Sequence, residues 1–116
     1  MRPSTKSRRS LTHKVRVSLE AKQDAREYAL WMKKERNAAS PAKKWLAGLR
    51  KRVRELASRA RAFDEIPELV PNERSIREFL YHSHRVIFEI DEQTHTVNIL
   101  RIYHSARQLR TGDLEP

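Results

Sequence analysis

The sequence predicts an α+β fold with the element order β-α-α-β-β-β, in which a helical hairpin covers one face of a small, mostly antiparallel sheet. Two runs rich in β-branched and aromatic residues, 85–90 and 97–103, flank a polar stretch, which is typical of a β-hairpin. Residues 13–19 alternate polar and apolar side chains, as a strand with one buried face does. Between these regions, two segments carry apolar residues at three- and four-residue spacing, the period of an amphipathic helix.

Length and composition indicate one small basic domain. The chain has 116 residues, of which 38% are hydrophobic and 34% charged, and a formal net charge of +10. This excess favours an anionic partner such as nucleic acid, the ribosome or an acidic protein segment. The absence of cysteine excludes disulfides and is compatible with a cytoplasmic location, and no apolar run is long enough for a membrane span or a secretory signal. With only two glycines, a P-loop or dinucleotide-binding loop is excluded, and we expect no cofactor.

The N-terminal half is expected to contain a tail, a strand and two helices. Residues 1–12 are basic and rich in Ser and Thr, which is typical of a disordered tail that either binds phosphate or has no role. In the strand at 13–19, Val15, Val17 and Leu19 share one side. A helix over about 20–36 is followed by a short connection at 37–39 and by a second helix, with Ser40 as N-cap and Pro41 at its first position.

Each predicted helix has one apolar face, which we expect to pack in the core; a groove for a partner is the alternative. Trp31 lies off this face and either packs between the helices or stacks on bases. The apolar faces comprise Ala21, Ala25, Tyr28, Ala29 and Met32 in the first helix, and Ala42, Trp45, Leu46, Leu49, Val53, Leu56, Ala57 and Ala60 in the second.

The outer face of the second helix is strongly basic. Between Lys43 and Arg61 there are eight Lys and Arg residues and a single acid, Glu55. Few acidic side chains are spaced to neutralise them along the helix, so the face is either simply solvated or the footprint of an anionic target. The candidate residues for binding nucleic acid or another target, on this helix and in the C-terminal half, are Arg50, Lys51, Arg54, Arg77, His82 and Arg101.

The C-terminal half is expected to form three consecutive antiparallel strands. A loop with two prolines at 63–73 precedes a strand at 76–81, and Asp91–Thr96 connects the two hairpin strands by a loop of several residues, since it contains no Asn-Gly or Asp-Gly. Residues 108–116 form a polar tail. Alternation places Val86, Phe88 and Ile90 on one face of the first hairpin strand; in the second, Leu100 and Ile102 share a face opposite Val97, Ile99 and Tyr103.

Histidines also cluster in this half. His82 and His84 form a His-x-His pair whose side chains would share one strand face. Two histidines without a third ligand make a poor metal site, so we expect no metal. His95 lies in the hairpin loop, where we expect it to be exposed.

The hairpin sequence resembles the RelE/ParE superfamily of bacterial type II toxin–antitoxin toxins, which includes plasmid stabilisation proteins. The resemblance rests on the strand Arg85–Asp91, on Val97–His104 and on Ala106-Arg107, where an aliphatic strand ends in His-x-x-Arg. It covers about residues 13–107. It implies a growth-arresting toxin that a cognate antitoxin holds inactive in a hetero-oligomeric complex.

Two mechanisms occur in that superfamily. RelE-like members cleave mRNA in the ribosome without a metal, and a RelE-like mechanism would make Arg85, His104 and Arg107 catalytic, as cations and proton-transfer groups around the phosphate. ParE-like members inhibit DNA gyrase without chemistry of their own. Arg85 and His104 occur in both kinds, but the long helical hairpin, the lack of a lysine pair before the hairpin strands and the lack of a tyrosine after His104 favour a ParE-like protein. A nucleic-acid-binding module without toxicity is a third possibility.

Overall fold

The observed element order is the predicted one. A computed structural model describes residues 12–35, 37, 39–69 and 74–105. Apart from Thr12, the predicted tails at 1–12 and 108–116 lie outside these residues. The elements are β1 (Lys14–Val17), α2 (Leu19–Glu35), α3 (Ala39–Arg59), the 3-10 turns η1 (Ala60–Ala62) and η2 (Pro67–Leu69), β2 (Ile76–Tyr81), β3 (His84–Asp91) and β4 (Thr96–His104).

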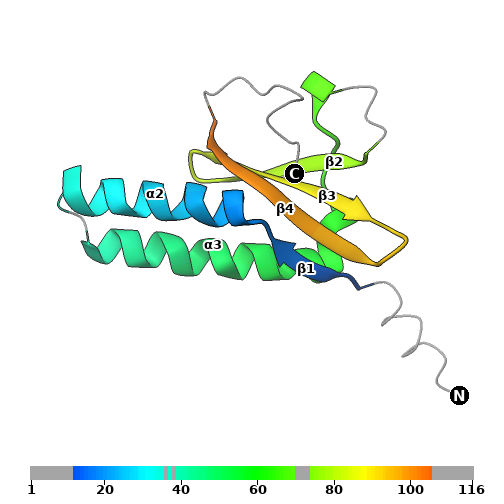
Figure 1. The fold of residues 1–116 in the computed structure, drawn as a ribbon, viewed down its shortest axis with the longest axis horizontal. Helices are drawn as coiled ribbons and strands as arrows, with labels where there is room; N and C mark the ends of the chain where they lie inside the picture. Colours follow the sequence, from blue (N-terminus) through cyan, green and yellow to red (C-terminus); the bar gives the residue numbers. More distant parts are fainter. Residues whose placement is uncertain (1–11, 36, 38, 70–73, 106–116) are drawn as a thin grey trace, which may run out of the picture.

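The sheet has four strands in the order β1-β4-β3-β2 (Figure 1). β2, β3 and β4 form the predicted antiparallel meander, and β1 pairs with β4 in parallel. The connection from β3 to β4 spans four residues between the paired Asp91 and Thr96, as the lack of a tight-turn sequence predicts. The two hairpin strands are therefore the central strands, which explains why apolar residues occur on both of their faces.

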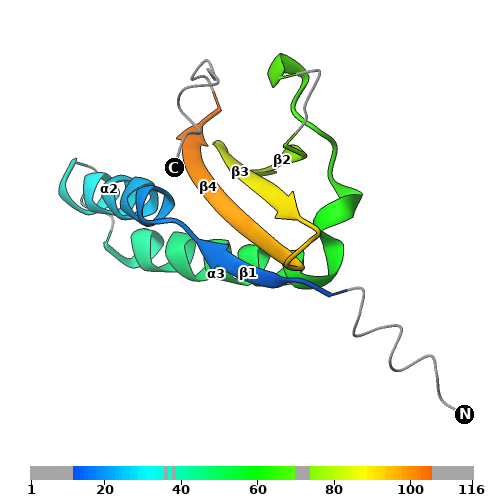
Figure 2. The same cartoon turned by 45° about the vertical axis from the view of Figure 1, so that its right-hand side comes forward.

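The two helices lie side by side and cover one face of the sheet (Figures 1 and 2). α2 contributes mainly alanines to the buried layer (Ala21, Ala25 and Ala29), whereas α3 contributes Ala42, Trp45, Leu49, Val53 and Leu56. Most of these side chains form one core cluster with Val86, Phe88 and Ile90 of β3. The predicted apolar faces therefore do pack in the core. Neither helix in the described ranges is both long enough and apolar enough to cross a membrane.

A second, smaller apolar cluster covers part of the opposite face of the sheet. Ile66, Ile76, Ile87 and Tyr103 are its buried members. Ile66 belongs to the segment predicted as a loop, and its backbone N–H donates to the carbonyl of Ile76 at 3.2 Å. The segment between α3 and β2 thus covers the sheet as well as connecting two elements.

The predicted face assignment in β4 holds for Val97, Ile99 and Leu100 but is wrong for Ile102 and Tyr103. Val97, Ile99 and Ile102 pack on the helix side, while Leu100 and Tyr103 belong to the cluster on the opposite side. The cause is a β-bulge: Ile87 pairs with Arg101 and Phe88 pairs with Ile99, which leaves Leu100 as an extra residue. An extra residue shifts the alternation of every side chain beyond it.

Both helices begin earlier than predicted. α2 begins at Leu19, which is 68% exposed and does not continue the strand. Ser18 is the N-cap, because its Oγ accepts a hydrogen bond from the N–H of Ala21 at 3.0 Å. α3 begins at Ala39, so Ser40 lies inside its first turn and is not the N-cap. Pro41 is tolerated there because N–H groups in the first turn have no partner within the helix.

Candidate functional site

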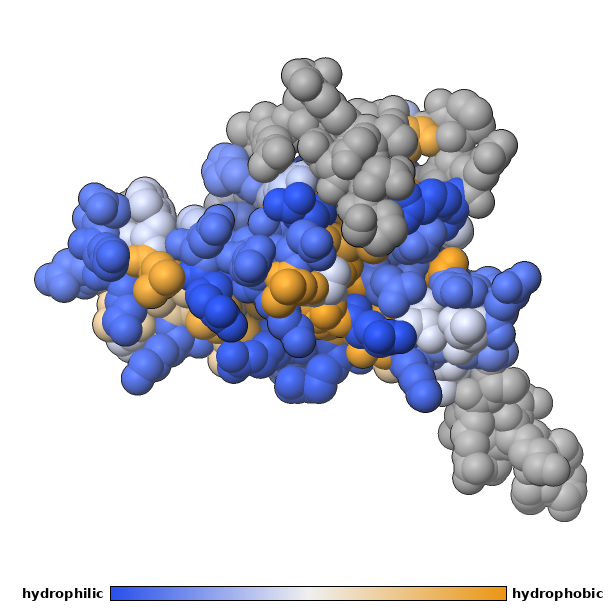
Figure 3. Space-filling view, viewed as in Figure 1, coloured by the Kyte–Doolittle hydropathy of each residue, from blue (hydrophilic) through white to orange (hydrophobic). Residues whose placement is uncertain are grey.

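An apolar groove of about 460 Å³ opens between β1, α2 and α3. Figure 3 shows apolar side chains gathered in this region and surrounded by hydrophilic ones. Val15 and Val17 of β1 and Ile102 of β4 line it together with Ala21, Ala25, Leu46, Leu49 and Val53 of the helices. The apolar face of the helices thus serves two roles, since Leu49 and Val53 are buried in the core and also line the groove.

The polar residues at the groove are all basic. Lys22 and Arg26 come from α2, Arg50 and Arg54 come from α3, and the lining described in the structure includes no acid. All four are exposed residues. An apolar groove with basic residues at its rim is chemically suited to an amphipathic peptide whose apolar side chains are flanked by acidic ones.

The outer face of α3 is solvent-exposed and basic, as predicted. The candidate target-binding residues Arg50, Lys51 and Arg54 are all exposed there, as are Lys43, Lys44 and Arg59. Arg52 differs: it is half-buried, and its guanidinium lies 4.9 Å from the centre of the Phe79 ring. The structure therefore presents most of these charges to solvent.

The candidate arginines of the sheet are held by internal partners. Arg85 is 7% exposed, and its Nε donates to the carboxylate of Glu78 at 2.5 Å. Arg101 donates two hydrogen bonds of 2.9 Å to Asp24. Arg77 donates from Nη1 to the carbonyl of Phe63 at 2.6 Å. These contacts fix the three side chains against the protein.

The candidate histidines do not share a strand face. His82 lies in the two-residue turn between β2 and β3, with a φ of 54°, and is exposed, whereas His84 is 5% exposed. The prediction placed the pair on one continuous strand, which the turn interrupts. His95 in the β3–β4 loop is exposed, as predicted. Arg107 lies outside the described residues.

His84 lies in a cluster of rings. Its ring centre is 4.3 Å from that of Tyr28, 5.3 Å from Trp45 and 5.6 Å from His104. Burial lowers the pKa of His84, and the nearby His104 lowers it further. His104 itself is exposed at the end of β4. The structure therefore offers a buried His84 with a lowered pKa and a solvent-facing His104.

The chain matches the family model of the ParE toxin of the type II toxin–antitoxin system parDE over residues 15–109. The chain belongs to this family. A comparison with curated proteins finds no match.

Solved structures of chains from toxin–antitoxin systems share the fold of this ParE-family chain. A chain from the toxin–antitoxin complex RelBE2 of Mycobacterium tuberculosis has a TM-score of 0.57 and 20% identity, covering 80% of this chain and 98% of that chain. A chain from the chromosomal ParDE system of P. aeruginosa has a TM-score of 0.63 and 18% identity, covering 80% of this chain and 96% of that one. The predicted RelE/ParE-like fold is thereby confirmed.

The sequence did not predict two parts of the candidate site in this ParE-family chain. Lys22 and Arg26 lie one turn apart on α2 beside its alanine face, a spacing that signals a shared surface. Asp24 and Glu78, the carboxylates that hold Arg101 and Arg85, were not singled out either. No local pattern marks them, because each finds its arginine on another element.

Proposed function

We propose that this ParE-family toxin arrests growth by inhibiting DNA gyrase and that a cognate antitoxin neutralises it. The family match over residues 15–109 supports a toxin of a toxin–antitoxin system. The observation that favours inhibition by binding over RNA cleavage is the state of the sheet arginines: Arg85 and Arg101 are ion-paired with carboxylates of the same chain.

RNA cleavage has requirements that this arrangement meets poorly. A base must reach the ribose 2′-OH, and cations must lie where charge develops on the phosphate. The positive charge of Arg85 is instead compensated by Glu78, and burial limits the access of a substrate phosphate to its guanidinium. The exposed cations are concentrated on α3 and around the groove, which is an arrangement for binding a macromolecule.

Pulse labelling after induction tests the target. We expect thymidine incorporation to fall within minutes while methionine incorporation continues, and we expect the purified protein to inhibit DNA supercoiling by gyrase. The variant His104→Ala distinguishes the two mechanisms, because His104 is exposed and its removal leaves the core intact. It should retain toxicity.

The opposite result would identify a ribonuclease. An early fall in methionine incorporation, together with loss of toxicity in His104→Ala and Arg85→Gln, would reinstate Arg85, His104 and Arg107 as catalytic candidates. If neither label falls on induction, the protein is a basic binding module without toxicity.

We further propose that the groove binds an amphipathic segment of the antitoxin with acidic residues beside its apolar ones. The two solved structures reported above come from toxin–antitoxin systems. The apolar lining and the four basic residues supply the complementary surface.

A matched pair of variants tests this site. Arg50→Glu/Arg54→Glu reverses two charges at the groove, and Lys44→Glu/Lys51→Glu reverses two exposed charges on the same helix that do not line the groove. The first variant should weaken antitoxin binding by roughly tenfold or more, because like charges across an interface repel. Equal weakening by both variants would show that only total charge matters and that the groove is not the site.

A further inference from the structure

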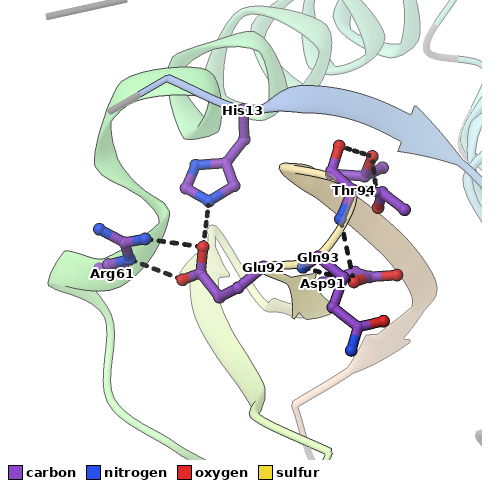
Figure 4. A network of polar contacts seen from close by, with 7 residues as sticks. His13, Arg61, Asp91, Glu92, Gln93 and Thr94 are labelled. Atoms are coloured by element: carbon purple, nitrogen blue, oxygen red, sulfur yellow. Dashed lines mark hydrogen bonds and ion pairs between the residues drawn. The ribbon is translucent and has the colours of Figure 1, made fainter. Parts of the chain in front are cut away.

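Three potential metal ligands meet where β1 begins and the β3–β4 loop turns. One ligand atom each from His13, Glu92 and His95 lies within 4.8 Å of the others. His13 is 7% exposed, whereas Glu92 and His95 are exposed. Figure 4 shows the His13 ring pointing at the Glu92 carboxylate, with Nε2 of His13 at 3.1 Å from Oε1 of Glu92.

The backbone fixes both histidines. The N–H of His13 donates to the carbonyl of Ala57 at 2.7 Å, which ties it to the end of α3. The carbonyl of His95 accepts from the N–H of Lys14 at 2.8 Å, in line with the β1–β4 pairing. His95 has a φ of 53°, and its ring centre is 5.9 Å from that of His13. The backbone thus holds the two histidines beside each other, and the exposed side chain of His95 has room to rotate.

Glu92 is oriented by Arg61. Nε and Nη2 of Arg61 each donate to one carboxylate oxygen at 2.7 Å (Figure 4). A carboxylate has about four lone-pair positions, so the two hydrogen bonds from Arg61 leave a lone pair on Oε1 that can face His13. Carboxylate ligands of metals are commonly hydrogen-bonded by an outer partner of this kind.

We propose that His13, Glu92 and His95 bind a zinc ion or a similar late first-row divalent cation. Bonds of about 2.0–2.1 Å to a tetrahedral zinc place neighbouring ligand atoms about 3.3 Å apart. The distance of 3.1 Å between Nε2 of His13 and Oε1 of Glu92 is close to this value. Two imidazoles and one carboxylate select such ions over Mg²⁺ or Ca²⁺, which prefer oxygen ligands, and water fills the fourth position.

This site differs from the one that the sequence drew attention to. His82 lies in an exposed turn, whereas His84 is buried. The proposed ligands His13 and Glu92 are 79 positions apart in the sequence and come together only in the folded chain. A bound ion cross-links the start of β1 to the β3–β4 loop, and it stabilises the folded chain because the unfolded chain does not hold the ligands together.

The test is binding of Zn²⁺ and of the spectroscopic probe Co²⁺ to the purified full chain. We expect one ion per chain, visible absorption of tetrahedral Co²⁺ and a melting temperature that rises with Zn²⁺ and returns on chelation. Mg²⁺ at the same concentration should have no such effect. His95→Ala should lose at least about tenfold in affinity, whereas His104→Ala, which removes another exposed histidine, should bind as the parent chain does.

Two results would overturn the proposal. One is the absence of stoichiometric Zn²⁺ or Co²⁺ binding up to about 100 µM, a concentration that would saturate even a weak structural site. The other is equal affinity of the parent chain and His95→Ala, which would place the ion elsewhere. Circular dichroism of His95→Ala in the absence of metal controls for folding, and neither readout depends on toxicity.

Discussion

At the scale of single residues, Gly48 permits the close approach of β2 to α3. The hydroxyl of Tyr81 on β2 donates to the carbonyl of Trp45 on α3 at 2.7 Å. A Cβ at position 48 would overlap that hydroxyl. In an ordinary helix, glycine costs about 1 kcal/mol relative to alanine. Here the contact with a buried, rigid ring requires it.

Gly48→Ala is therefore expected to destabilise the fold by about 1–3 kcal/mol, the usual cost of overpacking. In the Tyr81→Phe background the overlapping oxygen is absent and the nearest ring carbon lies at 3.4 Å, so the same substitution should be neutral or stabilising. Urea unfolding of the four chains gives the double-mutant cycle. An equal loss in both backgrounds would disprove the steric explanation.

His84 makes stability depend on pH. Its pKa is lowered from 6.5 by burial, then by His104, so the folded chain protonates His84 only at a lower pH than the unfolded chain does. The unfolded state therefore binds more protons once the pH falls below about 6.5, and the free energy of unfolding decreases down to the folded pKa. Thermal unfolding from pH 8 to pH 5 should show this loss.

His84→Phe is the variant for this prediction. It keeps an aromatic ring among Tyr28 and Trp45 but has no titrating group, so the loss between pH 6.5 and pH 5 should be smaller than in the parent chain. His82→Ala, which removes an exposed histidine, should keep the parent profile. A profile for His84→Phe that matches the parent would assign the pH dependence to other groups.

At the scale of elements, β4 extends beyond the end of β1, and α2 supplies the missing partners. The pairing of the two strands ends at Val17 and Ile99. Past this point, Ser18 Oγ donates to the carbonyl of Leu100 at 2.9 Å, and Oδ2 of Asp24 accepts from the N–H of Ile102 at 2.9 Å. Asp24 also accepts both hydrogen bonds of Arg101. A helix side chain thus takes the place of a strand at this edge.

Asp24→Ala should cost about 1–3 kcal/mol, because it removes the acceptor of the Ile102 N–H and of two hydrogen bonds from the half-buried Arg101. Chemical denaturation measures the change. Asp64→Ala is the control, since Asp64 is an exposed acid and its removal should change stability by less than about 0.5 kcal/mol. Similar losses for both variants would mean that net charge, and not the acceptor role, sets the effect.

At the scale of the whole molecule, the layers separate apolar packing from charge. The helical hairpin covers the sheet with its apolar side and presents basic side chains to solvent, at the groove and along α3. With a net charge of +10, the surface should steer an acidic partner during diffusion, and salt should screen this attraction.

Association with the antitoxin is accordingly expected to slow as ionic strength rises, with a smaller change in the dissociation rate. Stopped-flow or surface-binding kinetics over a range of NaCl concentrations measures both rates. The Arg50→Glu/Arg54→Glu variant should show a shallower salt dependence than the parent chain. An association rate that does not change with salt would contradict the proposed electrostatic complementarity.

The local pattern of the sequence determined the element order, the buried faces of both helices and the exposed basic face of α3. These follow from periodicity and composition, which act over a few residues. The family resemblance rested on the same hairpin residues, and the match over residues 15–109 confirmed it.

Only the tertiary structure decided which faces Ile102 and Tyr103 of β4 occupy and that Arg85 and Arg101 are ion-paired. It also decided that basic residues surround the groove and that His13 contacts Glu92. Each depends on register or on contacts between distant segments: one bulge reverses the alternation in β4, and Asp24 and Arg101 are 77 positions apart. A side chain's local sequence fixes its direction along an element, but its partners depend on how the elements pack.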